Sequence, residues 1–507
     1  MLDTPIIARP SSRTNPLLLT DFYKVGHKFQ YPPGTTLVYS NLTPRRSRMA
    51  IDQMVFFGLQ YFIQRYLISC FNEDFFAQPR DWVIDSYRRR VRGALGADLP
   101  SYDHVADLHE LGYLPIRIKA LPEGTLVPMR VPCLTIVNTR PEFYWLTNFF
   151  ETLLSSVVWQ PCTSATIAFE YKKLLTRWAR ATGMSDAFVQ WQAHDFSYRG
   201  LSSPESAITS GMAHLTCFTG TDTIPAIDAL EHYYGADAET ELVGGSVPAT
   251  EHSVMCAGSK DEELATFRRL IVDVYPAGIV SVVSDTWDLW QVLTQFLPKL
   301  KEHVLARPGG KVVIRPDSGD PVKIICGDSE HPEAPQRKGV IELLWDTFGG
   351  TITATGHKLL DSHVGAIYGD SITLDRANQI AQRLSSKGFA SQCVFGVGSY
   401  TYQYNTRDTL GLAMKATYVE IGKEQRPIFK DPVTDNGTKK SATGLLRVDR
   451  PDSRGSLLAV TENVTWADEQ KGLLRTVFED GLSRNISTLA EIRTRLAQRL
   501  SEELEAV

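Results

Sequence analysis

The stretch Lys311–Pro321 reads KVVIRPDSGDP. It begins with an apolar, β-branched run that is typical of a buried strand, and then Arg315, Asp317, Ser318 and Asp320 follow at once. A turn needs the proline, the glycine and one aspartate, but it does not need an arginine with two carboxylates. The surplus of charge at the end of an apolar run therefore indicates a ligand site.

The same pattern recurs along the middle of the chain, where short apolar runs end in polar or glycine residues. Most runs are separated by about 25–35 residues, the length of a βα unit. This repetition predicts an α/β fold, either an irregular TIM-like α/β barrel or an open parallel sheet. The runs that we interpret as strands are Phe188–Ala193, Leu215–Phe218, Ser246–Ala249, Ile279–Val283, Val312–Ile314, Val364–Tyr368 and Gln392–Phe395.

A helix is predicted between two of these strands, in the segment SITLDRANQIAQRLSSKG at residues 371–388. Its apolar residues recur at helical spacing and share one face. Thr373 is a suitable N-cap and Gly388 a suitable C-terminal stop. The residues of the apolar face are Leu374, Ala377, Ile380, Ala381 and Leu384.

The two ends of the chain differ from the middle. Stretches such as TTLVYSNLTPR and LPIRIKALPEGTLVPMRVPCLTIVNT alternate and carry proline and glycine, which is typical of antiparallel strands. The C-terminal part combines the strand KATYVEIG with a charged helix near Leu489–Leu504. We therefore expect an additional mixed α+β domain built from both chain ends, residues 1–180 and 401–507, around a barrel at 181–400.

Composition excludes several classes of protein. The 507 residues carry a net charge of −5, so no nucleic-acid-binding character is visible at the level of the whole chain. No apolar run is long enough to span a membrane, and the start, MLDTPIIARPSSRTNP, lacks the pattern of a secretory signal. The seven cysteines are scattered and never spaced as C-x-x-C. We expect a cytoplasmic protein without nucleic-acid or membrane partners.

Parallel strands of a barrel bring their carboxyl ends to one rim, where ligands bind. Arginines and glycine-rich loops suit phosphates, and nearby carboxylates suit a magnesium-bound diphosphate. The chemistry implied is a phosphorylated sugar, a metal and a histidine. The rim residues are Arg199, Arg315, Asp195, Asp222, Glu251, His252, Asp285, Asp317 and Asp370, with Gly369, Gly396 and Gly398.

These residues lie within longer motifs: TDFYKVGHKFQYPPGT, HDFSYRGLSSPESA, GTDT, VPATEHSV, VSVVSDTWD, IRPDSGDP, YGDSI and FKDPVTD. Together they resemble the nicotinamide phosphoribosyltransferase family, from about residue 17 to residue 480 of this chain. The resemblance implies transfer of the phosphoribosyl group of 5-phosphoribosyl-1-diphosphate to nicotinamide, yielding nicotinamide mononucleotide and diphosphate. It also implies a homodimer with sites at the subunit interface.

The resemblance assigns three residues to the pyridine base. Phe196 matches an aromatic residue that stacks on the ring, and Tyr23 matches a second aromatic residue from the partner subunit. Asp222 matches the carboxylate that accepts a hydrogen bond from the carboxamide and repels nicotinate. From the residues alone, Phe196 could equally be a core residue and Asp222 a helix N-cap.

The resemblance assigns other residues to the phosphoribosyl diphosphate, with Mg²⁺, and to ATP. His252 matches a histidine that ATP phosphorylates, and Asp285 matches the carboxylate that orients it. From the residues alone, His252 and the basic side chains could be ordinary surface residues. The residues matched to diphosphate and ribose are Arg199, Arg315, Asp317, Gly369, Asp370, Gly398 and Ser399, and the basic residues matched to phosphates are Arg45, Arg407, Lys415 and Lys430.

The chain departs from the family pattern at three places. Ser399 replaces a glycine of the phosphate loop, and Ala413 replaces a serine near phosphate. The insertion at residues 326–339 also differs. These differences leave the phosphate-loop geometry and the coupling to ATP open.

Four other classes of protein compete with this interpretation of the sequence. A nicotinate phosphoribosyltransferase would share the fold, but Asp222 disfavours it. A phosphoribosyltransferase of the Rossmann-like type needs a second acid and threonines that LIVDVYPAG lacks, and a P-loop kinase needs a motif that is missing. A non-catalytic nucleotide-binding protein on this scaffold stays possible, although such proteins usually lose the acids and bases that are present here.

Overall fold

The structure, a computed structural model, describes residues 13–434, 437, 440–451 and 457–505. It divides into two compact units, Met1–Thr163 with Arg407–Ser487, and Ser164–Thr406 with Thr488–Val507. The start of the chain, on which we based the expectation of no signal segment, lies mostly outside the described residues, as does Asp435 of the motif FKDPVTD. None of the helices in the described ranges is long and apolar enough to cross a membrane.

The second unit contains a parallel sheet with the strand order β7-β6-β13-β12-β9-β8. Apolar side chains of its central strands, such as Val312, Ile314 and Val364, are buried. Single parallel bridges join Gly220 to Gly245 at one edge and Ser281 to Ala249 at the other, so residues 245–249 connect both edges of the curled sheet. The strands are β6 (Ala193–Asp195), β7 (Gly220–Thr221), β8 (Ile279–Val283), β9 (Lys311–Arg315), β12 (Val364–Tyr368) and β13 (Val394–Val397).

Helices connect the strands of this sheet, as the βα repetition predicted. The helix predicted after residue 371 is confirmed as α17 (Leu374–Ser386), capped by the side chain of Thr373 and buried along its apolar face. The other helices are α7 (Asp186–Gln192), α8 (Pro204–Leu215), α9 (Ile224–Tyr234), α10 (His252–Ala257), α11 (Glu263–Arg268), α12 (Leu289–Gln291), α13 (Leu297–Leu305), α14 (Pro321–Cys326), α15 (Ala334–Lys338), α16 (Val340–Phe348) and α18 (Ser399–Tyr402).

Three predicted strands were wrong in extent, and a fourth, Ser246–Ala249, is no strand but takes part only in single bridges at Gly245 and Ala249. The predicted strand Gln392–Phe395 is shifted, because β13 runs from Val394 to Val397. Most of Phe188–Ala193 belongs to α7, and Leu215 is the last residue of α8, so that β6 and β7 begin only at Ala193 and Gly220. Short apolar runs do not distinguish a strand from the buried face of a helix, and the true strands here have only three and two residues. The predicted strands in β8, β9 and β12 are confirmed.

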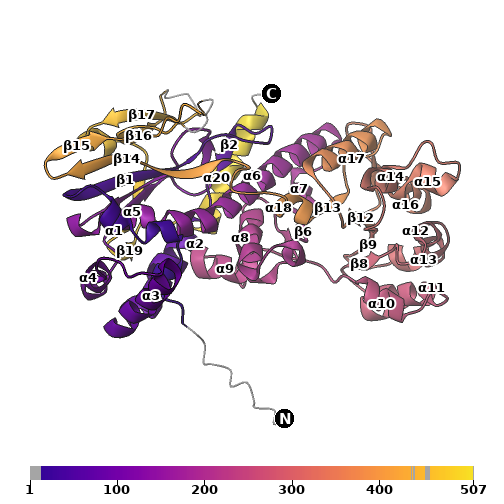
Figure 1. Cartoon of the computed structure of the whole chain (residues 1–507). Coiled ribbons are helices and arrows are strands. Elements are labelled where there is room, and N and C mark those ends of the chain that lie inside the picture. The colour runs from indigo at the N-terminus through magenta and orange to yellow at the C-terminus, as the bar shows by residue number, and fades with distance from the viewer. Residues whose placement is uncertain (1–12, 435–436, 438–439, 452–456, 506–507) are drawn as a thin grey trace, which may run out of the picture. The chain divides into compact units, whose positions relative to one another are not determined.

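The first unit contains an antiparallel sheet with the order β15-β14-β1-β5-β3-β18-β19. β1 and β14 come from opposite ends of the chain and pair along most of their length (Figure 1). The mixed domain built from both ends is therefore present. Its strands are β1 (Thr35–Pro44), β3 (Ile116–Ala120), β5 (Leu134–Asn138), β14 (Leu412–Ile421), β15 (Glu424–Pro427), β18 (Arg475–Glu479) and β19 (Leu482–Ser483).

Smaller elements complete the first unit, and helix α6 (Glu151–Ala181) runs across the boundary between the two units. Tyr39, Tyr418 and Leu446 form part of a buried cluster between the large sheet and a two-stranded ribbon. The remaining elements are β2 (Gln53–Val55), β4 (Leu126–Pro128), β16 (Leu445–Asp449), β17 (Ala459–Val464), α1 (His27–Gln30), α2 (Leu59–Phe62), α3 (Arg80–Leu95), α4 (Asp103–Leu111), α5 (Leu146–Phe149) and α19 (Trp466–Glu469).

The C-terminal helix α20 (Leu489–Glu505) belongs to the second unit, whereas we had assigned it to the α+β domain. The guanidinium of Arg493 donates hydrogen bonds to the carbonyl oxygens of Leu215, Leu242 and Val243. Such contacts between distant parts of the chain carry no local sequence signal.

Candidate active site

Polar residues that follow the strands of the parallel sheet line a cavity of about 790 Å³, a size typical of sites for small molecules. Glu251 of the predicted rim also lines it, with eight residues that were not predicted, among them Tyr198, Thr250, Ser371 and Tyr400. The predicted site residues in the lining are Phe196, Arg199, Asp222, His252, Arg315, Asp317, Gly369, Asp370, Gly398 and Ser399.

The ring of Phe196 lies directly on the backbone of Gly396. A Cβ atom added at Gly396 would stand 2.4 Å from Cδ2 and 2.7 Å from Cε2 of that ring. The backbone N–H of Phe196 also donates to the carbonyl oxygen of Val397, at 2.9 Å. The glycine therefore fixes the height of the ring above the sheet, at the wall of the cavity.

The Gly396→Ala variant should be less stable to unfolding than the wild type by about 1–3 kcal/mol, because the ring has to move away from the new methyl group. Urea unfolding measures this. Gly93→Ala is the matched control, since a Cβ atom there meets nothing within 4 Å and the residue lies inside helix α3, where alanine is the better helix former. Equal stability of the Gly396→Ala variant and the wild type would contradict the packing argument.

Asp222 follows β7 and is held by two side chains. The Nε2–H of His194 and the hydroxyl of Ser246 donate to its Oδ1, at 2.8 and 2.7 Å, and among the described residues none bonds to Oδ2. Burial favours the protonated carboxyl, but the hydrogen bonds outweigh it and lower the pKa of Asp222. The site thus presents an ionised oxygen that can accept a hydrogen bond.

Asp195, at the end of β6, organises this wall and is fully buried. Its Oδ1 accepts from the backbone N–H and hydroxyl of Ser197, and its Oδ2 accepts from the hydroxyl groups of Thr221 and Thr223. The carboxylate therefore ties the loop that carries Phe196 to the loop that carries Asp222. Asp195 therefore positions the two loops, but its side chain does not line the cavity.

Arg315 ends β9 and lines the cavity. One of its Nη2 hydrogens bonds the carbonyl oxygen of Thr250, whereas its buried Nε finds no partner in the described part of the chain. Burial lowers its pKa although the surrounding carboxylates oppose this, and an arginine stays charged in either case. A buried guanidinium with an unused donor is suited to an anionic ligand.

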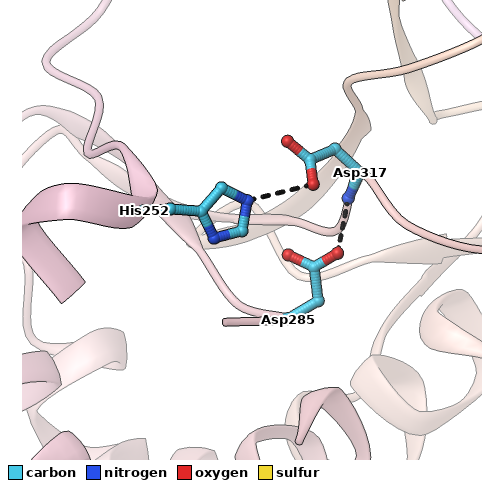
Figure 2. Close-up of side chains that lie close together, drawn as sticks. All are labelled: His252, Asp285 and Asp317. Atoms are coloured by element: carbon cyan, nitrogen blue, oxygen red, sulfur yellow. Dashed lines mark hydrogen bonds and ion pairs between the residues drawn. The ribbon is translucent and has the colours of Figure 1, made fainter. Parts of the chain in front are cut away.

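His252 begins α10, and its ring is held by residues of two other loops. Asp317 accepts from Nε2 at 3.1 Å (Figure 2), and the hydroxyl of Thr286 bonds to Nδ1 at 3.1 Å. Asp285 does not contact the imidazole. Its Oδ2 accepts instead from the backbone N–H groups of Asp317 and Ser318. The carboxylate that orients the histidine in the structure is therefore Asp317, and the predicted role of Asp285 is not seen.

The same three residues could hold a divalent cation. Ligand atoms of His252, Asp285 and Asp317 lie within 4.8 Å of one another. Oδ1 of Asp285 is buried and has no hydrogen-bond partner among the described residues. Unused carboxylate oxygens fit Mg²⁺, which prefers oxygen ligands.

The predicted phosphate loop follows β13, and its short helix α18 is held in place by hydrogen bonds to buried residues. The hydroxyl of Thr401 bonds the Tyr171 hydroxyl and the carbonyl oxygen of Ile372, and the Tyr402 hydroxyl bonds Nδ1 of His214. Nε2 of His214 bonds in turn to the carbonyl oxygen of Gly220. Sequence reasoning missed these residues, because they are ordinary core positions in the sequence.

Ser399, which departs from the family pattern, is accommodated by Gly200. A Cβ atom at Gly200 would stand 2.7 Å from Cβ of Ser399, so the serine side chain occupies the space that the glycine leaves. In the loop after β12, the backbone of Ser371 is strained, because its φ is 55°. The hydroxyl of Ser371 donates a hydrogen bond to the carboxylate of Asp370.

Asp285 and Gly396 of the second unit do not line this cavity, and neither do the remaining predicted residues, which belong to the first unit. Arg45 and Lys415 line a separate cavity of about 390 Å³, together with Ala413. Tyr23 is 65% exposed, and Arg407 forms an ion pair with Asp408. Lys430 lies near Lys415, and the positive charge of Lys430 helps to lower the pKa of Lys415.

Family models match most of the chain. The model described as the nicotinate phosphoribosyltransferase (NAPRTase) family matches residues 191–482, and that of the nicotinamide phosphoribosyltransferase N-terminal domain matches residues 15–118.

Two curated relatives are similar over nearly their whole length. A nicotinamide phosphoribosyltransferase of Acinetobacter baylyi is 55% identical over 503 residues, covering 97% of this chain and 98% of the relative. One from Mycoplasma pneumoniae is 36% identical, covering 89% and 99%.

Solved structures share the fold at low identity. Nicotinate-nucleotide pyrophosphorylase from Pyrococcus furiosus has a TM-score of 0.60 at 14% identity, covering 98% of both chains. Human nicotinic acid phosphoribosyltransferase has a TM-score of 0.56 at 16% identity, covering 95% of this chain and 93% of the human one.

Proposed function

The chain belongs to the nicotinate phosphoribosyltransferase family, and we propose that it transfers the 5-phosphoribosyl group of phosphoribosyl diphosphate to nicotinamide in NAD salvage. The bond from C1 of the ribose to the diphosphate breaks, and a bond to the ring nitrogen forms. The products are nicotinamide mononucleotide and diphosphate. The observation that carries this proposal is the 55% identity to a nicotinamide phosphoribosyltransferase over nearly the whole chain.

The cavity wall supports nicotinamide as the base. Phe196 offers a ring face for stacking, and Asp222 offers an ionised oxygen at the same wall. A carboxylate attracts the amide N–H of nicotinamide and repels the carboxylate of nicotinate. Nicotinate phosphoribosyl transfer is the second candidate, supported by the family model that matches residues 191–482.

Other residues of the cavity lining support the phosphoribosyl diphosphate as the second substrate. Arg199 and Arg315 supply positive charge for phosphate oxygens, and Asp317 and Asp370 supply acceptors for ribose hydroxyls. Gly369 and Gly398 let the backbone approach a phosphate closely, and Ser399 adds a hydroxyl that can donate to a phosphate oxygen.

Mg²⁺ is a proposed cofactor, with Asp285 and Asp317 as the residues that would hold it. When bound, it would neutralise the charge that develops on the leaving diphosphate. ATP is a proposed co-substrate that phosphorylates His252. We also propose that the second unit is an irregular TIM-like barrel, because single bridges join residues 245–249 to both edges of the parallel sheet. The scattered free cysteines support a cytoplasmic location.

The experiment that tests the function is a turnover assay. Purified protein with nicotinamide, phosphoribosyl diphosphate and Mg²⁺ should form nicotinamide mononucleotide, and chelation of Mg²⁺ should slow this strongly. Turnover with nicotinate but not with nicotinamide would show that the enzyme is a nicotinate phosphoribosyltransferase. A protein that binds both substrates without turnover would be a non-catalytic member of the family.

A homodimer with shared sites is also proposed, because Tyr23 and Arg45 belong to the first unit while the cavity belongs to the second. The variants Tyr23→Ala and Arg315→Ala should each be strongly impaired. Co-expressed in equal amounts, they should recover about a quarter of the wild-type activity, because half of the dimers then contain one intact site. No recovery, or a fully active monomer by light scattering, would overturn the shared site.

A further inference from the structure

Arg130 holds an unusual backbone conformation for an arginine. It is the third residue of the turn Pro128–Val131, in which the N–H of Val131 donates to the carbonyl oxygen of Pro128 at 3.1 Å. Its φ is 72°, in the left-handed region where a turn at this position favours glycine or asparagine. An arginine in such a strained backbone conformation indicates that its side chain has a function.

The turn places Arg130 beside Arg45. The N–H of Arg130 donates to the carbonyl oxygen of Pro44, the residue before Arg45, at 2.6 Å. Both arginines line the cavity of about 390 Å³ in the first unit, with Lys415 and Lys440. Glu462 is the acidic residue of the described lining.

The electrostatics of this cavity favour an anion. Burial lowers the pKa of Lys415, and the charges of Arg45 and Lys430 lower it further against the opposing effect of Glu151. Lys415 forms an ion pair with Glu151 at 3.7 Å and Lys440 one with Asp431 at 3.4 Å, but no ion pair of the Arg130 guanidinium is found within the residues that the structure describes. A guanidinium without an acidic partner among several other cations is suited to binding a phosphate.

We propose that Arg130 is an additional phosphate-binding residue of the enzyme. With Arg45 and Lys415 it forms a basic clamp in the first unit that holds the diphosphate group of the phosphorylated substrate. A planar guanidinium suits two phosphate oxygens at once, which a lysine does not. This inference rests on the proposed function for the identity of the ligand, but the clamp itself requires only a diphosphate anion.

Two variants separate the charge of Arg130 from its strain. Arg130→Gly and Arg130→Ala both remove the guanidinium, but only glycine relieves the left-handed backbone. Both should raise the KM for phosphoribosyl diphosphate by about 10-fold, a loss typical of one charged contact, and leave the KM for nicotinamide within about twofold. The urea midpoint of Arg130→Gly should exceed that of Arg130→Ala. Arg89→Ala, at an exposed arginine of α3 outside the cavity, is the control and should change neither constant.

Calorimetric binding of inorganic diphosphate distinguishes this inference from the proposed function. Both Arg130 variants should bind diphosphate about 10-fold more weakly than the wild type, whether or not the wild type catalyses phosphoribosyl transfer. Unchanged diphosphate affinity in both variants would overturn the clamp even if turnover is found. Absence of turnover together with weakened binding would overturn the proposed function and leave the clamp standing.

Discussion

In the Asp222→Asn variant, the preference for nicotinamide over nicotinate should fall by about 100- to 1,000-fold in kcat/KM. A hydrogen bond to a charged group contributes about 1.5–3 kcal/mol, and the lost repulsion of nicotinate adds to this. A site built around one such partner can discriminate between analogues by several powers of ten.

The hydrogen bonds of Asp222 determine how an asparagine at this position would be oriented. His194 and Ser246 both donate to Oδ1 of Asp222, so the amide oxygen of asparagine should take that position. Its NH₂ group then replaces Oδ2, can no longer accept from the amide N–H of nicotinamide, and can donate to the carboxylate of nicotinate. The change therefore reverses the recognition without changing the shape of the site.

Steady-state kinetics with both bases provide the measurement. The KM for phosphoribosyl diphosphate should stay nearly unchanged, which separates recognition of the base from general damage. Ser246→Ala is a control that keeps the charge of Asp222 and removes one of its supports. An unchanged ratio in Asp222→Asn would show that selectivity lies elsewhere, and a wild type that prefers nicotinate would show that Asp222 does not repel the acid.

The His252→Ala variant should lose ATP hydrolysis by at least about 1,000-fold, as expected when a nucleophile is removed, while slow phosphoribosyl transfer persists. In the proposed step, a ring nitrogen of His252 forms a bond to the γ-phosphorus of ATP, and the bond to the oxygen of the leaving ADP breaks. ATP should then no longer improve the use of nicotinamide.

Acid-labile phosphate on the protein after incubation with ATP gives the direct measurement. His232→Ala, at an exposed histidine of α9, is the matched control and should retain both phosphorylation and ATP hydrolysis. Wild-type protein that carries no acid-labile phosphate would rule out the phosphohistidine. ATP hydrolysis that persists in His252→Ala would move the nucleophile to another group.

Local patterns in the sequence predicted much of the second unit. Helix α17 and its Thr373 cap follow from apolar spacing and capping chemistry, and β8, β9 and β12 follow from apolar runs before polar turns. The prediction of strands failed at β6 and β7, where two or three residues of strand adjoin longer apolar helices. A short strand contributes too few residues for its period of two to be recognised.

The set of cavity residues also came from the sequence, because parallel strands bring the loops at their carboxyl ends to one edge. The resemblance to the family added what each residue does. Neither source predicted the partners of these residues. Asp317 rather than Asp285 accepts from the imidazole of His252, while Oδ2 of Asp285 accepts from the backbone of the next loop and its Oδ1 has no partner among the described residues.

The amino-acid sequence by itself determined the repeating βα units, the antiparallel end regions and part of the cavity lining, because polar loops that follow apolar runs are local patterns. Only the tertiary structure decided that Gly396 carries the ring of Phe196, that His194 and Ser246 hold Asp222, and that Arg130 stands beside Arg45. These contacts join loops that the folding of the sheets brings together. Which loop reaches which neighbour depends on strand order and register, and no local pattern of residues encodes either.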